Sequence, residues 1–120
     1  MKKLMKILFA SMVLVGCGSS NNEVNINNAE EYAKENNIKL IDVREPDEYA
    51  EGHLEGSTLV PLNELEDTIP LLIPNLNEEF IVYCRSGNRS GQAKELLEKQ
   101  GYTNVINAGG VLDYTGELTK

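Results

Sequence analysis

A cysteine followed by a short polar loop is the part of this sequence best suited to covalent chemistry. The apolar run Phe80–Tyr83 leads directly into Cys84, and the segment Arg85–Ser90 that follows is rich in small and basic residues. Such a loop directs successive backbone N–H groups inward, and a helix that starts there adds the positive end of its dipole. Cysteines in such surroundings have pKa values lowered to about 3.5–7.5 from about 8.5. The sequence therefore predicts a nucleophilic Cys84 thiolate, because a cysteine that only fills the core gains nothing from flanking arginines.

The elements that must position this loop alternate between strands and helices. Apolar runs with strand chemistry cover residues 38–43, 58–60, 80–84 and 104–107. Apolar residues at helical spacing predict helices near 29–33, 65–72 and 92–100. The segment 46–49, with its early proline, suits one helical turn. This alternation indicates an α/β domain with a mainly parallel central sheet flanked by helices. Ligands of such sheets bind at the carboxyl ends of the strands, where Cys84 lies.

Capping and breaking residues mark the predicted helix boundaries. Gly101 follows the helix over 92–100 at the position where a left-handed C-cap is common. Pro70 must kink or end the helix over 65–72. Two residue pairs have the spacing of N-terminal capping boxes, Asn28 with Glu31 and Asn63 with Glu66.

The first residues have the composition of an export signal. Met1–Lys6 is basic, and the apolar stretch Ile7–Val15 is too short to cross a bilayer as a helix. The segment Leu14–Cys17 resembles the lipobox of bacterial lipoproteins. That resemblance implies cleavage before Cys17 and attachment of lipid to its sulfur and its new amino group. Several acyl chains would hold the protein stably at the membrane.

The chain is therefore expected to have three parts. Residues 1–16 form a lipoprotein signal peptide, residues 17–28 form the lipid-anchored cysteine with a flexible polar tether, and residues 29–120 form one domain. We expect the protein to be exported and lipid-anchored to the bacterial cell envelope. A lipidated Cys17 could not join a disulfide, so Cys84 would be the only free thiol. A lone thiol argues against a dithiol oxidoreductase, which needs a resolving cysteine.

Net charge excludes some classes of partner. The chain has 11 basic and 19 acidic residues and a net charge of −8 at pH 7, and removal of Lys2, Lys3 and Lys6 with the leader would make it −11. So acidic a domain is a poor match for nucleic acid or for anionic lipid surfaces. An anionic substrate must therefore be captured by local positive groups.

Three segments together resemble the single-domain rhodaneses, a family of sulfurtransferases. They are Leu40–Tyr49 continued by Gly52–Ser57, Val82–Ser90, and Asn107–Tyr114. Tyr114 stands where the family usually places tryptophan, a departure that concerns local packing. The resemblance implies a rhodanese fold and a persulfide on Cys84, with no metal and no organic cofactor.

The implied reaction moves sulfur in two steps. The Cys84 thiolate attacks the outer sulfur of thiosulfate or a related donor, and the persulfide is then attacked by cyanide or a thiol. The substrate would be bound by the loop residues Arg85, Ser86, Gly87, Asn88 and Arg89. Arg85 has no obvious structural role, so we expect it to bind the donor anion.

Other charged residues have open or structural roles. Arg89 could bind the anion or could pair with Asp42 and hold two loops together. Arg44, spaced four residues from Glu48, is expected to brace the turn after the first strand rather than to contact substrate.

Two other functions remain possible on the same loop. Cysteine phosphatases and arsenate reductases use a similar anion cradle but place an arginine at least six residues after the cysteine, where this chain has Ser90. A catalytically idle binding module of rhodanese fold is the second, although such modules typically lack the cysteine.

Overall fold

The central sheet has four strands, all of them parallel. The structure, a computed structural model, describes residues 23–120. The order across the sheet is β2-β1-β3-β4. The strands are β1 (Lys39–Asp42), β2 (Thr58–Leu59), β3 (Phe80–Cys84) and β4 (Val105–Gly110). The helices are α1 (Ala29–Asn36), α2 (Pro46–Glu51), α3 (Leu65–Leu72) and α4 (Asn88–Lys99), with 3₁₀ turns η2 (Leu62–Glu64) and η3 (Val111–Asp113).

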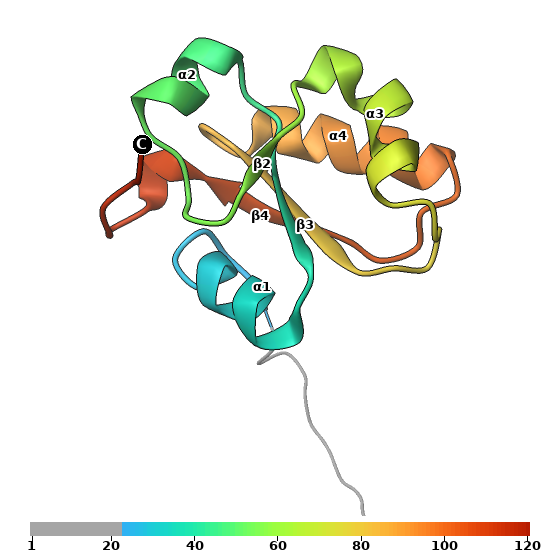
Figure 1. Ribbon diagram of the computed structural model, residues 1–120, viewed down its shortest axis with the longest axis horizontal. Helices are drawn as coiled ribbons and strands as arrows, with labels where there is room; N and C mark the ends of the chain where they lie inside the picture. Colours follow the sequence, from blue (N-terminus) through green and yellow to red (C-terminus); the bar gives the residue numbers. More distant parts are fainter. Residues whose placement is uncertain (1–22) are drawn as a thin grey trace, which may run out of the picture.

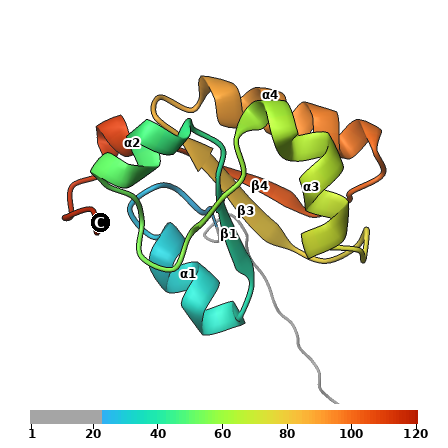
Figure 2. The same ribbon diagram turned by 45° about the horizontal axis from the view of Figure 1, so that its top comes forward.

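Helices cover both faces of the sheet. Figures 1 and 2 show α3 and α4 on one side and α1 on the other, with α2 near one end of the strands. The fold is therefore the α/β arrangement with a mainly parallel sheet that the sequence predicted, and it is confirmed.

Strand β3 is buried on both faces, which explains its continuous apolar sequence. Phe80, Val82 and Cys84 belong to the core cluster that includes residues of α3 and α4. Ile81 and Tyr83 belong to the second cluster, which includes residues of α1. Alternate side chains of a strand point to opposite faces, so Cys84 faces the side of the sheet that α4 covers.

Pro70 lies inside α3, and the helix continues to Leu72. A proline has no N–H to offer the carbonyl four residues earlier, which here belongs to Glu66. The side chain of Gln100 supplies the missing donor, because its Nε2 lies 3.1 Å from the Glu66 carbonyl oxygen. A contact from the end of α4 therefore helps α3 to tolerate its proline.

Two of the three predicted helix caps are absent, and one helix has a capping box that was not predicted. Neither Asn28 nor the start of α3 has a side-chain cap, so both predicted capping boxes are wrong. The Asn28 side chain instead accepts a hydrogen bond from the Asn25 N–H at 2.7 Å. A capping box does occur at α2, between Glu45 and Glu48.

The end of α4 matches its prediction, and its start does not. Gly101 has a φ of +109°. The Gly101 and Tyr102 N–H groups bond to the carbonyls of Glu98 and Leu97, the pattern of a Schellman motif. The helix begins at Asn88, four residues before the predicted start at 92, so its first turn belongs to the Cys84 loop.

The folded domain begins earlier than predicted. Ile26 is buried in the second core cluster. Asn27 donates to the Asp113 carbonyl at 3.0 Å and accepts from the Thr115 N–H at 2.8 Å. The tether cannot extend to residue 28, because these contacts fasten its end to the domain. The predicted signal peptide and Cys17 lie outside the described residues. Within residues 23–120, no helix is long and apolar enough to cross a membrane.

Candidate active site

The loop after β3 is closed by glycines and by the end of β4. Gly87 has a φ of +101° and forms the N-cap of α4, a conformation that few other residues adopt without strain. The Arg85 carbonyl accepts the Leu112 N–H at 3.0 Å. Gly110 lies so close to the Arg85 carbonyl that a side chain there would collide with it. The Arg85 carbonyl is thus turned toward the chain that follows β4.

Hydrogen-bond donors converge on the sulfur of Cys84. Its Sγ lies 3.0 Å from the Gly87 nitrogen, 3.4 Å from the Ser90 nitrogen and 3.5 Å from the Ser90 hydroxyl. Burial raises the pKa of the thiol, but hydrogen bonds from Ser90, Gly87 and Ser86 outweigh burial and hold the pKa below its ordinary value. The loop therefore favours the thiolate, the form that attacks sulfur.

Ser90 connects the sulfur to β4, a contact that the sequence reading missed. The buried Ser90 hydroxyl lies 2.7 Å from Oδ1 of Asn107. This Asn107 oxygen also accepts the Gly109 N–H at 2.9 Å. A signal was present in the sequence, because Asn107 is polar and is the last residue of the strand predicted over 104–107. In the structure it pairs with Val82, two residues before Cys84. Polar groups at the carboxyl edge of a parallel sheet meet the loops of neighbouring strands.

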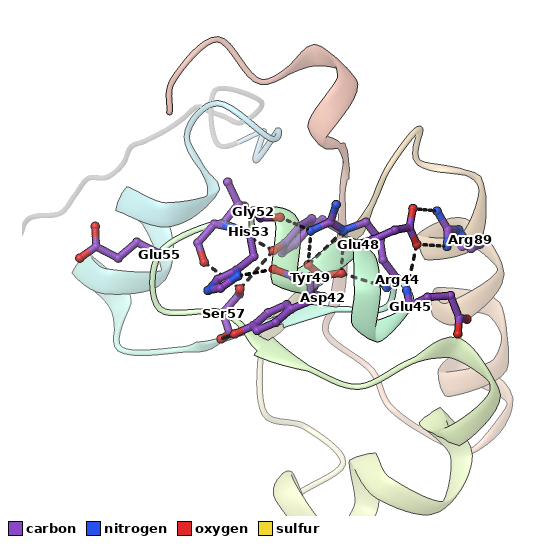
Figure 3. A network of polar contacts seen from close by, with 12 residues as sticks. Asp42, Arg44, Glu45, Glu48, Tyr49, Gly52, His53, Glu55, Ser57 and Arg89 are labelled. Atoms are coloured by element: carbon purple, nitrogen blue, oxygen red, sulfur yellow. Dashed lines mark hydrogen bonds and ion pairs between the residues drawn. The ribbon is translucent and has the colours of Figure 1, made fainter. Parts of the chain in front are cut away.

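The two arginines of the loop have different surroundings. Arg85 is exposed, and within residues 23–120 its guanidinium has no hydrogen bond or ion pair. Arg89 makes a bidentate ion pair with Glu48 of α2, at 2.8 and 3.0 Å (Figure 3). The suggested pairing of Arg89 with Asp42 is therefore wrong, since Glu48 holds that guanidinium.

Glu48 has two hydrogen-bonding roles at once. Its carboxylate pairs with Arg89 and also accepts the Glu45 N–H at 2.9 Å, which completes the capping box of α2. The bond from Arg89 is the main reason that the pKa of Glu48 falls to about 2. This ion pair connects α2 to the first turn of α4 and so fixes one side of the Cys84 loop.

Asp42 and Arg44 form a buried pair at the end of β1. Two bonds join Arg44 Nε and Asp42, and a third, at 2.8 Å, joins a terminal guanidinium nitrogen to Asp42 Oδ2. Arg44 also donates to the Gly52 carbonyl (Figure 3). Both side chains are almost fully buried: the exposed fraction is 5% for Arg44 and 0% for Asp42. The pair links β1 to the end of α2 and has no open side for a substrate.

The remaining predicted residues lie on the rim of the loop. Ser86 and Asn88 are exposed, and the Ser86 hydroxyl lies 3.4 Å from the Asn88 nitrogen. Gly87 contributes its N–H to the sulfur, as described above. Within residues 23–120, no three His, Cys, Asp or Glu side chains are grouped to hold a metal ion.

Comparisons with known proteins agree with this geometry. The model of the rhodanese-like domain family matches residues 25–117. The chain is 47% identical over 73 residues to the thiosulfate sulfurtransferase PspE of Escherichia coli, a match that covers 61% of this chain and 70% of that protein. It is 32% identical over 109 residues to the thiosulfate:glutathione sulfurtransferase of Saccharomyces cerevisiae, covering 73% and 78%.

A solved structure shows the same likeness in three dimensions. A rhodanese with anions from E. coli superposes with a TM-score of 0.64 at 42% identity, and the match covers 69% of this chain and 98% of that one. The chain belongs to the rhodanese-like domain family and is a thiosulfate sulfurtransferase-like enzyme.

Proposed function

We propose that Cys84 carries sulfane sulfur as a persulfide between a small anionic donor and a thiophilic acceptor. The observation that supports this best is the convergence of the Gly87 and Ser90 donors on one sulfur atom. These groups are fixed by the fold before any substrate arrives, so no reorganisation is needed when charge develops on the sulfur.

The first half of the reaction charges the cysteine. The Cys84 thiolate attacks the outer sulfur of thiosulfate, a new S–S bond forms, and the S–S bond of thiosulfate breaks. Sulfite leaves with the electron pair of that bond, and the outer sulfur stays on Cys84 as a persulfide anion. No general base is required, because the loop already favours the thiolate.

The second half returns the enzyme to its starting state. Cyanide or a thiolate attacks the outer sulfur, the persulfide bond breaks, and Cys84 leaves as a thiolate. The hydrogen bonds that favour the thiolate also make it a better leaving group. The yeast relative is named for transfer between thiosulfate and glutathione, which supports a small thiol as acceptor.

Arg85 supplies the charge that attracts the donor. It is the loop arginine without a carboxylate partner in the described part of the chain, whereas Glu48 neutralises Arg89. An acidic protein repels anions at long range, so one exposed guanidinium beside the loop gives the donor a local binding group.

The test compares sulfur transfer with phosphoryl transfer on one preparation. The purified chain is assayed for thiocyanate formed from thiosulfate and cyanide, and separately for hydrolysis of an aryl phosphate. We expect thiocyanate from the wild type, background levels from Cys84→Ser, and negligible phosphate release from either. Turnover of the aryl phosphate above that of thiosulfate would contradict the proposal.

A variant with a longer loop sharpens this choice. One glycine inserted between Ser86 and Gly87 moves Arg89 to the sixth position after the cysteine, the spacing of phosphatase loops. We expect the insertion to abolish most sulfur transfer, because the N–H groups no longer close on the sulfur. Full sulfur transfer by this variant would show that the reaction does not depend on the arrangement of hydrogen-bond donors around Sγ.

We also propose that the protein is exported and anchored through lipid on Cys17. The support is the basic and apolar leader with its lipobox-like end, Leu14–Cys17. Labelled fatty acid should enter the wild-type chain in bacteria and should not enter Cys17→Ser. Equal incorporation in both chains, or none in the wild type, would contradict the anchor.

A further inference from the structure

The hydroxyl of Ser90 is surrounded by more acceptors than it can serve. Its oxygen lies 2.7 Å from Oδ1 of Asn107, 3.1 Å from the Gly87 carbonyl, 3.4 Å from the Gly109 carbonyl and 3.5 Å from Sγ of Cys84. A serine hydroxyl has one proton to donate. The four acceptors therefore compete, and Asn107 holds the shortest contact.

Asn107 is itself fixed in place by the backbone. Its Oδ1 accepts the Gly109 N–H at 2.9 Å, and its Nδ2 points to the Gly87 carbonyl at 3.5 Å. The amide oxygen is thus held toward Ser90 from β4, and Ser90 lies in the first turn of α4, two residues after its start. Neither residue needs to move for the hydroxyl to turn from one acceptor to the other.

We propose that Asn107 is a positioning residue that competes with the Cys84 sulfur for the single hydroxyl proton of Ser90. When the hydroxyl donates to Asn107, its oxygen can accept the S–H of the neutral thiol. When the thiol ionises, the hydroxyl gains most by turning to the sulfur, because hydrogen bonds to an ionised acceptor are the stronger ones. Asn107 thereby favours the neutral thiol and limits how readily Cys84 ionises.

This competition would tune the reactivity of the sulfur and goes beyond the proposed persulfide reaction, on which it rests. A thiolate becomes a weaker nucleophile as its pKa falls, and attack is fastest when the thiol pKa is near the ambient pH. Three hydrogen-bond donors aimed at one sulfur would lower that pKa steeply. By accepting the Ser90 hydroxyl, Asn107 removes one of these donors from the sulfur and keeps the thiolate nucleophilic.

The charged groups around the loop stay the same when Asn107 is changed. They include Arg85 in the loop, Arg89 of α4 with Glu48 of α2 and the nearby Glu45, the pair Asp42 and Arg44 at the end of β1, and Asp113 in η3. Strand β4 itself has no titratable side chain. A shift in the ionisation of Cys84 on changing Asn107 is therefore not the loss of a charge.

The experiment measures how the alkylation rate of Cys84 depends on pH. The full chain carries Cys17→Ser, which leaves Cys84 as its one thiol, and iodoacetamide is the probe. Three variants are compared in this background: Asn107→Leu, Ser90→Ala, and both together. Asn104→Leu is the matched control, because it removes one hydrogen bond, to the Asn77 carbonyl, just before the start of β4.

The proposal requires a particular pattern of shifts. Asn107→Leu should lower the pH midpoint of alkylation by about 0.5–1 unit, and Ser90→Ala should raise it by a similar amount. The double variant should match Ser90→Ala alone, and Asn104→Leu should match the background. A midpoint that rises or stays unchanged in Asn107→Leu would overturn the proposal.

The double variant separates this mechanism from a purely structural effect. If Asn107→Leu shifts the midpoint as much without the Ser90 hydroxyl as with it, Asn107 acts by some other route and the proposal is wrong. Thiocyanate formation in the same chains reports on the persulfide chemistry independently. Loss of that activity in the Cys17→Ser background alone would count against the proposed function and would leave the alkylation comparison intact.

Discussion

Two polar clusters lie beside one another at the carboxyl ends of the strands, and they use their hydrogen bonds differently. In the segment from Asp42 to Ser57, polar groups bond to one another: Asp42 with Arg44, Tyr49 with the Ser57 carbonyl, and His53 with the Tyr49 carbonyl (Figure 3). In the loop from Cys84 to Ser90, three donors converge on one sulfur.

The difference separates a scaffold from a reactive site. Groups that satisfy one another stabilise the fold and offer little to a ligand, whereas donors aimed at one ionisable atom favour a charge there. The ion pair of Glu48 with Arg89 joins the two clusters. We therefore expect changes in the segment 42–57 to affect stability and changes in the loop 84–90 to affect chemistry.

The largest effect on stability should come from Asp42→Ala. This change leaves the buried guanidinium of Arg44 without its partner, and loss of one member of a buried ion pair costs about 3–5 kcal/mol of unfolding free energy. Urea unfolding at pH 7 measures it. Lys39→Ala is the matched control, because the exposed pair of Lys39 with Glu78 should contribute less than about 1 kcal/mol. Equal losses in both variants would contradict the distinction between the clusters.

Arg85→Gln should leave stability almost unchanged and should reduce activity. The guanidinium is exposed and unpaired within residues 23–120, so its loss should change the unfolding free energy by less than about 0.5 kcal/mol. If Arg85 binds the donor anion, kcat/KM for thiosulfate should fall about 10- to 100-fold through loss of charged hydrogen bonds. Steady-state kinetics and urea unfolding on one preparation check both halves. Unchanged kinetics would remove Arg85 from the donor site.

Glu48→Gln should have the smallest of the three expected effects, a loss of stability. Its pH dependence should identify the carboxylate charge as the cause. The carboxylate has a pKa of about 2 in the folded chain and an ordinary value of 4.5, so its stabilising effect is present above pH 4.5 and is lost as the pH falls toward 2. The partly exposed pair should contribute about 1 kcal/mol at pH 7. Urea midpoints of the two chains should differ at pH 7 and approach each other between pH 4.5 and 3. A constant difference over that range would mean that the carboxylate charge is not the cause.

Local patterns in the sequence predicted most of the fold. The apolar run ending at Cys84 marks a strand buried on both faces, and the polar loop with its glycine marks a strand-to-helix turn. These patterns depend on neighbours within a few residues, which the sequence displays directly.

Long-range partners could not be predicted in the same way. Arg89 pairs with a residue 41 positions earlier, and Ser90 bonds to a residue 17 positions later. The predicted cap at Asn28 failed for a related reason, because its side-chain oxygen is already bonded to the Asn25 N–H. Spacing shows that a side chain could form a bond, and only the packed fold decides which of several partners it takes.

The mass of the chain after treatment with thiosulfate tests the central claim most directly. The full chain with Cys17→Ser should gain the mass of one sulfur atom, and cyanide should then remove it, because the sulfur is held as a persulfide on Cys84. The same chain with Cys84→Ser as well should gain nothing. An equal gain in both chains, or no gain in the chain that retains Cys84, would contradict the account.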